Sequence, residues 1–169
     1  MGRAALFALL AAGPALAAGP ALAAGPSLTA TAAGGWGFAH WGMSPDAVRA
    51  ASNGRAHPET DDMDSHTDVV DGGATIDGLK FAVRLEYSAS GLAQIDFHLL
   101  GSVADCKALG AYLADTYGKH ATQETSEAFD TLIWDDPASG NSIAWSRMGD
   151  GAEVCDVTYD PLSTESDVR

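Results

Sequence analysis

The chain has 169 residues, of which 46% are apolar, and it carries 23 acidic residues against 9 lysines and arginines. Its formal net charge of −14 at pH 7 argues against binding to nucleic acid or to anionic lipid surfaces, because both carry the same sign of charge. A basic protein partner or divalent cations would complement this charge better, although acidity that only maintains solubility is the simpler interpretation.

The first 32 residues have the pattern of a secretory signal peptide. Arg3 precedes an apolar run at 4–12, and a tract of small residues follows, with Ala-x-Ala cleavage sites after Ala17, Ala23 or Ala32. The run is shorter than the roughly 20 apolar residues that a membrane-spanning helix needs. We therefore expect no membrane span and a mature chain that is periplasmic or secreted.

The part beyond the leader is long enough for one domain with a hydrophobic core. It holds all 23 acidic residues and 8 of the 9 basic ones, which gives a formal charge of −15. No cysteine stands directly after the leader, at the start of the mature chain, which argues against a lipid-anchored lipoprotein. We expect a single domain at 34–160 and a flexible tail at 161–169.

Three aromatic residues, Trp36, Phe38 and Trp41, lie in a glycine-rich stretch at the start of this domain. They are candidate interaction residues, because aromatic side chains are favoured at the centres of interfaces. The alternative is that they pin the N-terminal segment across the domain's own core. A short helix should follow, with Ser44 as its cap and Pro45 at the first helical position.

Residues 57–73 form a polar, acidic segment, predicted to be a loop with at most a short strand around Val69–Val70. Oxygen ligands at alternate positions can gather a calcium ion, and the segment offers Asp62, Asp64, His66 and Asp68. It is not an EF-hand, because Thr67 and Gly73 stand where that loop needs glycine and glutamate. The two interpretations are a weak Ca²⁺ site and a solvated acidic loop.

Alternation of apolar and polar residues predicts an antiparallel hairpin, with strands at 79–87 and 93–99. After a polar link at 120–127, three further strands are predicted at 129–134, 142–148 and 152–159. Turns rich in glycine, proline and asparagine separate them.

A second, longer helix is predicted between Ser102 and Gly118, with Ser102 as cap, Asp105 completing a capping box and Gly118 as the stop. Its predicted buried face includes Cys106. The only other cysteine, Cys155, lies in the last predicted strand. In an exported chain the two are most simply a disulfide, and the alternative is a pair of buried thiols.

The fold class that follows is α+β, with an antiparallel sheet of five to six strands and two helices on one face. The expected order is one helix, two or three strands, the second helix and three strands, written α-β-β(-β)-α-β-β-β.

Short motifs of this chain resemble an uncharacterised family of small secreted or periplasmic bacterial proteins. They are WGMSPDAV at 41–48, the run from Cys106 to Gly118, Trp134, and the alternating Cys155, Val157 and Tyr159. More distantly, the order of elements is similar to the fold shared by β-lactamase inhibitor proteins and the outer-membrane assembly lipoprotein BamE (SmpA/OmlA). The resemblance implies a binding or assembly module without a cofactor.

No Gly-x-Ser-x-Gly elbow, Cys-x-x-Cys pair or paired-histidine zinc motif occurs in the chain. The first hypothesis is therefore an exported, non-catalytic module that binds an envelope or secreted protein. The alternatives are a calcium-binding acidic domain and an enzyme of unrecognised type.

Overall fold

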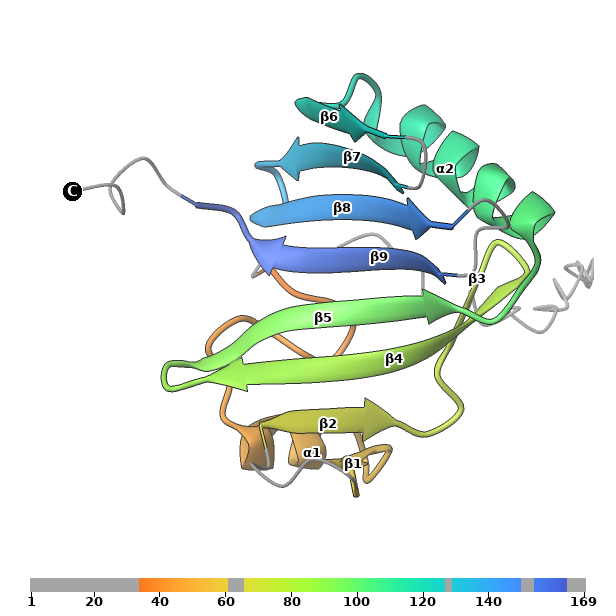
Figure 1. The fold of residues 1–169 in the computed structure, drawn as a ribbon. Helices are drawn as coiled ribbons and strands as arrows, with labels where there is room; N and C mark the ends of the chain where they lie inside the picture. Colours follow the sequence, from red (N-terminus) through yellow and green to blue (C-terminus); the bar gives the residue numbers. More distant parts are fainter. Residues whose placement is uncertain (1–33, 61–65, 127–128, 150–153, 164–169) are drawn as a thin grey trace, which may run out of the picture.

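The computed structural model describes residues 34–60, 66–126, 129–149 and 154–163. Within these residues, two helices and nine strands form an α+β fold around one antiparallel sheet (Figure 1). The elements in chain order are α1 (Pro45–Ala51), β1 (Ala56–Pro58), β2 (Thr67–Val70), β3 (Ala74–Ile76), β4 (Leu79–Ser88), β5 (Gly91–Leu99), α2 (Val103–Tyr117), β6 (Thr122–Thr125), β7 (Phe129–Asp136), β8 (Asn141–Met148) and β9 (Val154–Pro161).

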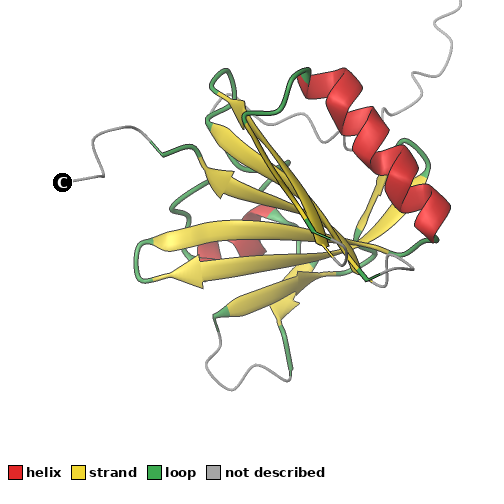
Figure 2. Ribbon diagram, turned by 45° about the horizontal axis from the view of Figure 1, so that its top comes forward, coloured by secondary structure: helices red, strands yellow, loops and turns green. Residues whose placement is uncertain are grey.

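The strands are ordered β1-β2-β4-β5-β9-β8-β7-β6 across the sheet, and β3 pairs with β4 beside β2. The last strand, β9, therefore lies in the middle, between the hairpin β4–β5 and the meander β6–β8. The strands fan out along the twisted sheet, and the long helix α2 lies to one side of it (Figure 2).

The predicted α+β class, the antiparallel sheet and both helices are confirmed, but the prediction of five to six strands is wrong. The extra strands, β1, β3 and β6, have three or four residues each. Segments of that length are too short to show an alternating pattern, and all four residues of β6 are exposed. The two edge strands β1 and β6 thus overlap the segments predicted as a loop at 57–73 and a link at 120–127.

One face of the sheet forms the hydrophobic core. A single cross-strand row on it runs from Val83 through Phe97, Val157 and Trp145 to Leu132. The first four of these side chains are buried and Leu132 is partly buried against them. We call this the inner face.

Helix α2 packs on the inner face through its predicted buried side. Cys106 and Cys155 form the predicted disulfide, with an S–S distance of 2.02 Å. One turn later, Gly110 lies so close to Trp145 that a Cβ atom would stand 3.2 Å from the indole ring. The capping box of Ser102 with Asp105 and the C-terminal cap at Gly118 are also as predicted.

Helix α1 packs on the same face by a buried ion pair. Its Arg49 donates from Nη2 to Oδ1 of Asp68 at 2.7 Å and from Nε to Oδ2 at 3.0 Å. Asp68 is fully buried and stands opposite Leu85, whose side chain belongs to the inner face. Tyr87 donates its hydroxyl to the same carboxylate at 3.0 Å, and burial raises the pKa of this tyrosine well above its ordinary value.

The disulfide is consistent with an oxidising, extracytoplasmic compartment. No helix of the described residues is long and apolar enough to cross a membrane. The predicted leader, residues 1–32, and the end of the tail, residues 164–169, lie outside the described residues. Pro161 is the last residue of β9, and Leu162 N donates to the carbonyl of Gly140 at 3.0 Å.

Candidate interaction surface

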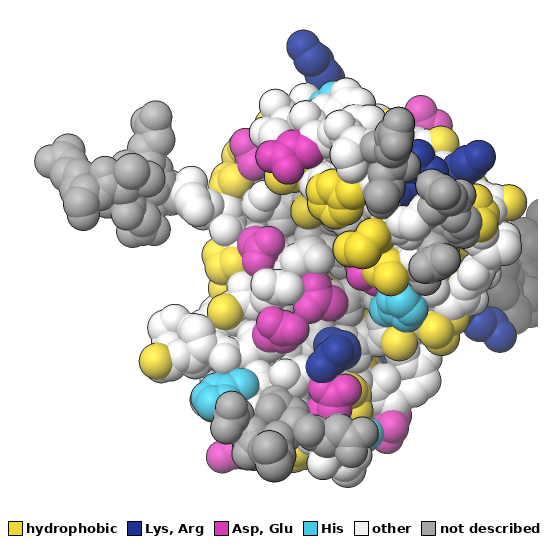
Figure 3. All heavy atoms as spheres, viewed as in Figure 1, with side chains coloured by type: hydrophobic (Ala, Val, Ile, Leu, Met, Phe, Trp, Pro, Cys, Tyr) yellow, Lys and Arg dark blue, Asp and Glu magenta, His cyan; other side chains and the backbone are white. Residues whose placement is uncertain are grey.

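No described helix covers the face of the sheet opposite α1 and α2. We call it the open face; Figure 1 and Figure 3 view the molecule from this side. Its residues alternate along each strand with those of the inner face, so its make-up follows directly from the strand register. In Figure 3, acidic side chains gather over β4, β5 and β9, and apolar ones lie over β7 and β8.

Apolar side chains line up at one end of the open face. Phe129 on β7 stands opposite Met148 on β8, which stands opposite Val154 on β9. Extending the β5–β9 register by two residues places Leu100 level with Val154. We call these four residues the apolar row. Leu100 is 59% exposed and Met148 is 51% exposed, and these two are the exposed large apolar side chains of the described residues.

Carboxylates dominate the rest of the open face. Outward positions in strands β4 to β9, as far as the structure describes them, hold six acidic residues and two basic ones. The acidic residues are Glu86, Asp96, Glu124, Asp135, Asp156 and Asp160, and the basic ones are Lys80 and Arg84. We call Glu86, Asp96, Asp156 and Asp160, which lie on the central strands, the acidic patch.

The centre of the acidic patch is held by neutral donors. Asp96 accepts hydrogen bonds from Gln94 Nε2, at 3.0 and 3.1 Å, and from Thr158 Oγ1 at 2.8 Å. Burial and the negative charge of Asp96 raise the pKa values of Glu86 and Asp160. The crowding of these carboxylates therefore costs free energy that a nearby positive charge would recover.

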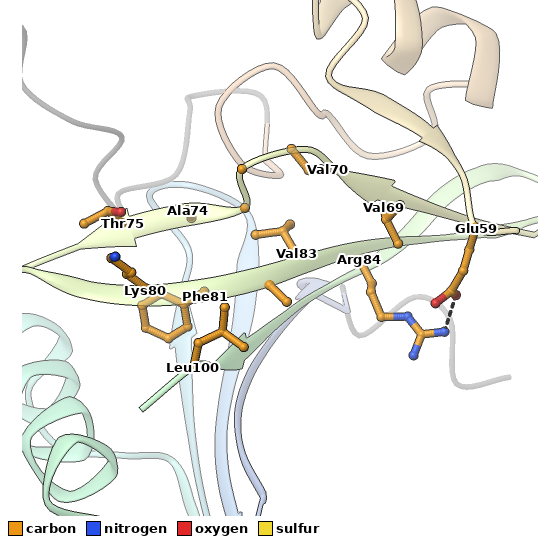
Figure 4. A pocket seen from close by; sticks show the side chains of 13 residues that line it. Glu59, Val69, Val70, Ala74, Thr75, Lys80, Phe81, Val83, Arg84 and Leu100 are labelled. Carbon is orange, nitrogen blue, oxygen red and sulfur yellow. Dashed lines mark hydrogen bonds and ion pairs between the residues drawn. The ribbon is translucent and has the colours of Figure 1, made fainter. Parts of the chain in front are cut away.

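Two adjoining hollows lie where the apolar row meets the acidic patch. The first has a volume of about 560 Å³ and includes Val69, Gly73, Lys80 and Leu100 in its lining (Figure 4). The second, of about 520 Å³, is lined by Ala82, Arg84, Asp96, His98 and Asp156. Ala82 and Arg84 of β4 line both, and we call the two adjoining hollows together the groove.

An ion pair and a histidine–carboxylate hydrogen bond lie along this groove. Arg84 donates to Glu59, and Figure 4 shows the Arg84 guanidinium at one end of the first hollow. His98 Nδ1 lies 2.7 Å from Oδ1 of Asp156 in the second hollow. Asp96 lines the same hollow and accepts hydrogen bonds from Gln94 and Thr158, and its cross-strand neighbour Arg84 points to Glu59 instead.

Of the predicted calcium ligands, Asp62 and Asp64 lie outside the described residues. His66 is exposed, whereas both carboxylate oxygens of Asp68 are occupied by Arg49 and Tyr87 inside the core. Within the described residues, no three histidine, cysteine or acidic side chains converge on a possible metal position. The calcium site thus stays a prediction that depends on residues 61–65.

The candidate interaction residues near the N-terminus pack against the domain. Trp36 is only 2% exposed and meets Phe97 edge to face, with ring centroids 5.1 Å apart. Trp41 donates Nε1–H to Oδ1 of the buried Asn141 at 2.8 Å, and Gly35 N donates to the same atom at 2.9 Å. Phe38 and Trp41 are partly buried against the core. A role for these residues in partner binding stays a prediction.

The prediction of two helices on one face leaves the other face of the sheet uncovered, but it did not include the apolar row. The members of this row come from separate strands, and only the register aligns them. No family model, no curated protein and no solved structure matches this chain.

Proposed function

We propose that this chain is an exported, non-catalytic binding module that docks a protein partner on the open face of its sheet. The observation that carries the proposal is the alignment of Leu100 and Met148, both more than half exposed, in one cross-strand row. Scattered exposed apolar residues are ordinary, but a contiguous apolar row bordered by polar residues is typical of an interaction site.

Two further features support the proposal. The leader pattern and the disulfide fit an extracytoplasmic compartment, where the partner would be an envelope or secreted protein. The groove offers no convergent nucleophile, base and oxyanion donors among the residues that line it.

Chemical crosslinking in a periplasmic and outer-membrane extract, with mass spectrometry of the captured proteins, tests the proposal. The double variant Leu100→Ser, Met148→Ser should lose the partner that the natural chain captures. The matched control is Ala111→Ser, on the exposed side of α2. A partner retained by the double variant, or no partner enriched by the natural chain, would overturn the proposal.

A further inference from the structure

The open face is divided into an apolar end and an acidic remainder, and this division specifies the partner's chemistry. The inference rests on the proposed function and goes one step beyond it. We propose that the partner docks a basic amphipathic segment, whose apolar side chains cover the apolar row and whose lysines or arginines reach the acidic patch.

The strand geometry sets the spacing that such a segment must match. Along β9 the outward residues are Val154, Asp156, Thr158 and Asp160. Successive outward positions on a strand are about 7 Å apart, so the acidic patch begins about 7 Å from the apolar row and extends to about 20 Å. A partner segment that carries apolar and basic residues within a few positions of each other spans this distance.

The groove explains how the two parts of the site cooperate. Leu100 borders the first hollow and Asp96 the second, and on β5 the outward side chain between them is His98. The cross-strand neighbour of His98 is the small Ala82, which lines both hollows, so an apolar side chain beside Leu100 and a cation beside Asp96 can be placed along β4. That cation would meet the carboxylate of Asp96, which accepts hydrogen bonds from Gln94 and Thr158.

Charge selects a basic partner over the other occupants of such a face. A second copy of this chain would bring two acidic patches together, which Coulomb repulsion opposes. An anionic lipid surface is repelled in the same way. A single metal ion does not fit either, because the carboxylates of the acidic patch are spread along three strands, and no described set of three converges on one point.

The test uses three synthetic peptides added to the ¹⁵N-labelled protein and followed by amide chemical shifts. The first has four leucines followed by four arginines, the second replaces arginine by glutamate, and the third replaces leucine by serine. We expect only the first to bind, with shifts confined to the apolar row and the acidic patch. Its affinity should fall as NaCl rises from about 50 to 300 mM, because exposed charge pairs are screened by salt.

Variants separate the two parts of the site. Asp96→Asn and Asp160→Asn should each weaken binding of the leucine–arginine peptide about threefold, the range of exposed ion pairs. Leu100→Ser should weaken it about fivefold through lost apolar burial. Asp115→Asn, an equally conservative change at an exposed position of α2, should leave binding unchanged.

Equal binding of the glutamate peptide, shifts on the helical side, or no shifts at millimolar concentration would overturn the inference. The proposed function fails separately. In the outcome that separates the two, the double variant of Leu100 and Met148 loses the crosslinked partner while salt and Asp96→Asn leave its capture unchanged. That result would support the binding module and contradict the basic partner.

Discussion

The two helices of the described residues lie against the same face of the sheet but are attached to it by different chemistry. Helix α2 has 15 residues, a full capping box and a covalent bond to β9. Helix α1 has seven residues, a single side-chain cap and a buried ion pair between Arg49 and Asp68. The long helix buries four residues on the inner face, whereas the short one buries only Val48 and adds the ion pair.

This difference shows how the inner face supports the open face. The disulfide fixes α2 to β9, the strand that carries Val154, Asp156 and Asp160 outward. The ion pair fixes α1 to β2, which adjoins β4 and the first hollow. The disulfide therefore stabilises the β9 part of the proposed docking surface, and the ion pair stabilises the part beside the first hollow. Each attachment can be removed by its own substitutions.

The largest effect is expected from the covalent attachment. Replacing both cysteines by alanine should lower the free energy of unfolding by about 4 kcal/mol, the chain-entropy value for a link that spans 49 positions. Urea denaturation of the double variant measures this loss, and reduction of the natural protein should reproduce it. A loss below about 1 kcal/mol in both experiments would show that α2 holds its place without the bond.

The ion pair is expected to come second. Arg49→Met should cost about 3 kcal/mol, because it leaves the fully buried carboxylate of Asp68 without its cation. The matched control is Arg55→Met, since Arg55 is exposed and donates only to the backbone carbonyls of Asp71 and Gly73. The control should cost less than about 1 kcal/mol. Equal urea midpoints for the two variants would contradict the proposed role of Arg49.

The contrast between the helices also shows what the sequence could and could not predict. Both helices were predictable because their caps are local: Ser44 with Pro45, and Ser102 with Asp105, act within one turn. The hairpin β4–β5 was predictable because it alternates for several residues. Strand β2 was largely missed because a buried aspartate, Asp68, replaces the apolar residue that the pattern requires.

No local pattern in the sequence indicates the long-range polar contacts. Asn141 lies in a segment predicted as a turn, yet it is fully buried and binds Gly35 and Trp41, more than 90 positions earlier. The partner of Arg49 and the alignment of Leu100 with Met148 depend in the same way on which strands become neighbours. Periodicity along one segment cannot specify that choice, because it reports only which residues share a face.

A smaller difference is expected between the two helix caps. Ser102→Ala should cost about 1 kcal/mol, because it removes the acceptor for Asp105 N and one donor to the Asp105 carboxylate. Ser44→Ala should lower the free energy of unfolding by about 0.5 kcal/mol, because Ser44 Oγ accepts a single exposed hydrogen bond, from Ala47 N at 3.3 Å. Urea midpoints rank the two variants, and a larger loss at Ser44 would reverse the comparison.

The smallest expected effect is a pH dependence confined to α2. The Asp105 carboxylate accepts from the backbone N and the hydroxyl of Ser102, each at 2.7 Å, and these hydrogen bonds lower its pKa below the ordinary 3.8. Because the pKa in the folded state is the lower one, the stabilisation is complete above the unfolded-state pKa and is lost as pH falls through the folded-state value.

Melting temperatures of the natural protein and of Asp105→Asn between about pH 2 and pH 6 test this dependence. The difference in melting temperature between the two proteins should be constant above about pH 5. It should disappear toward pH 2, because the carboxylate is then neutral in both the folded and the unfolded state. Ala111→Ser, on the same helix and also exposed, changes no ionisable group and should give a difference that stays constant with pH. A difference for Asp105→Asn that widens toward low pH would mean that the capping box does not favour the ionised carboxylate, and that the α2 terminus is held by the disulfide alone.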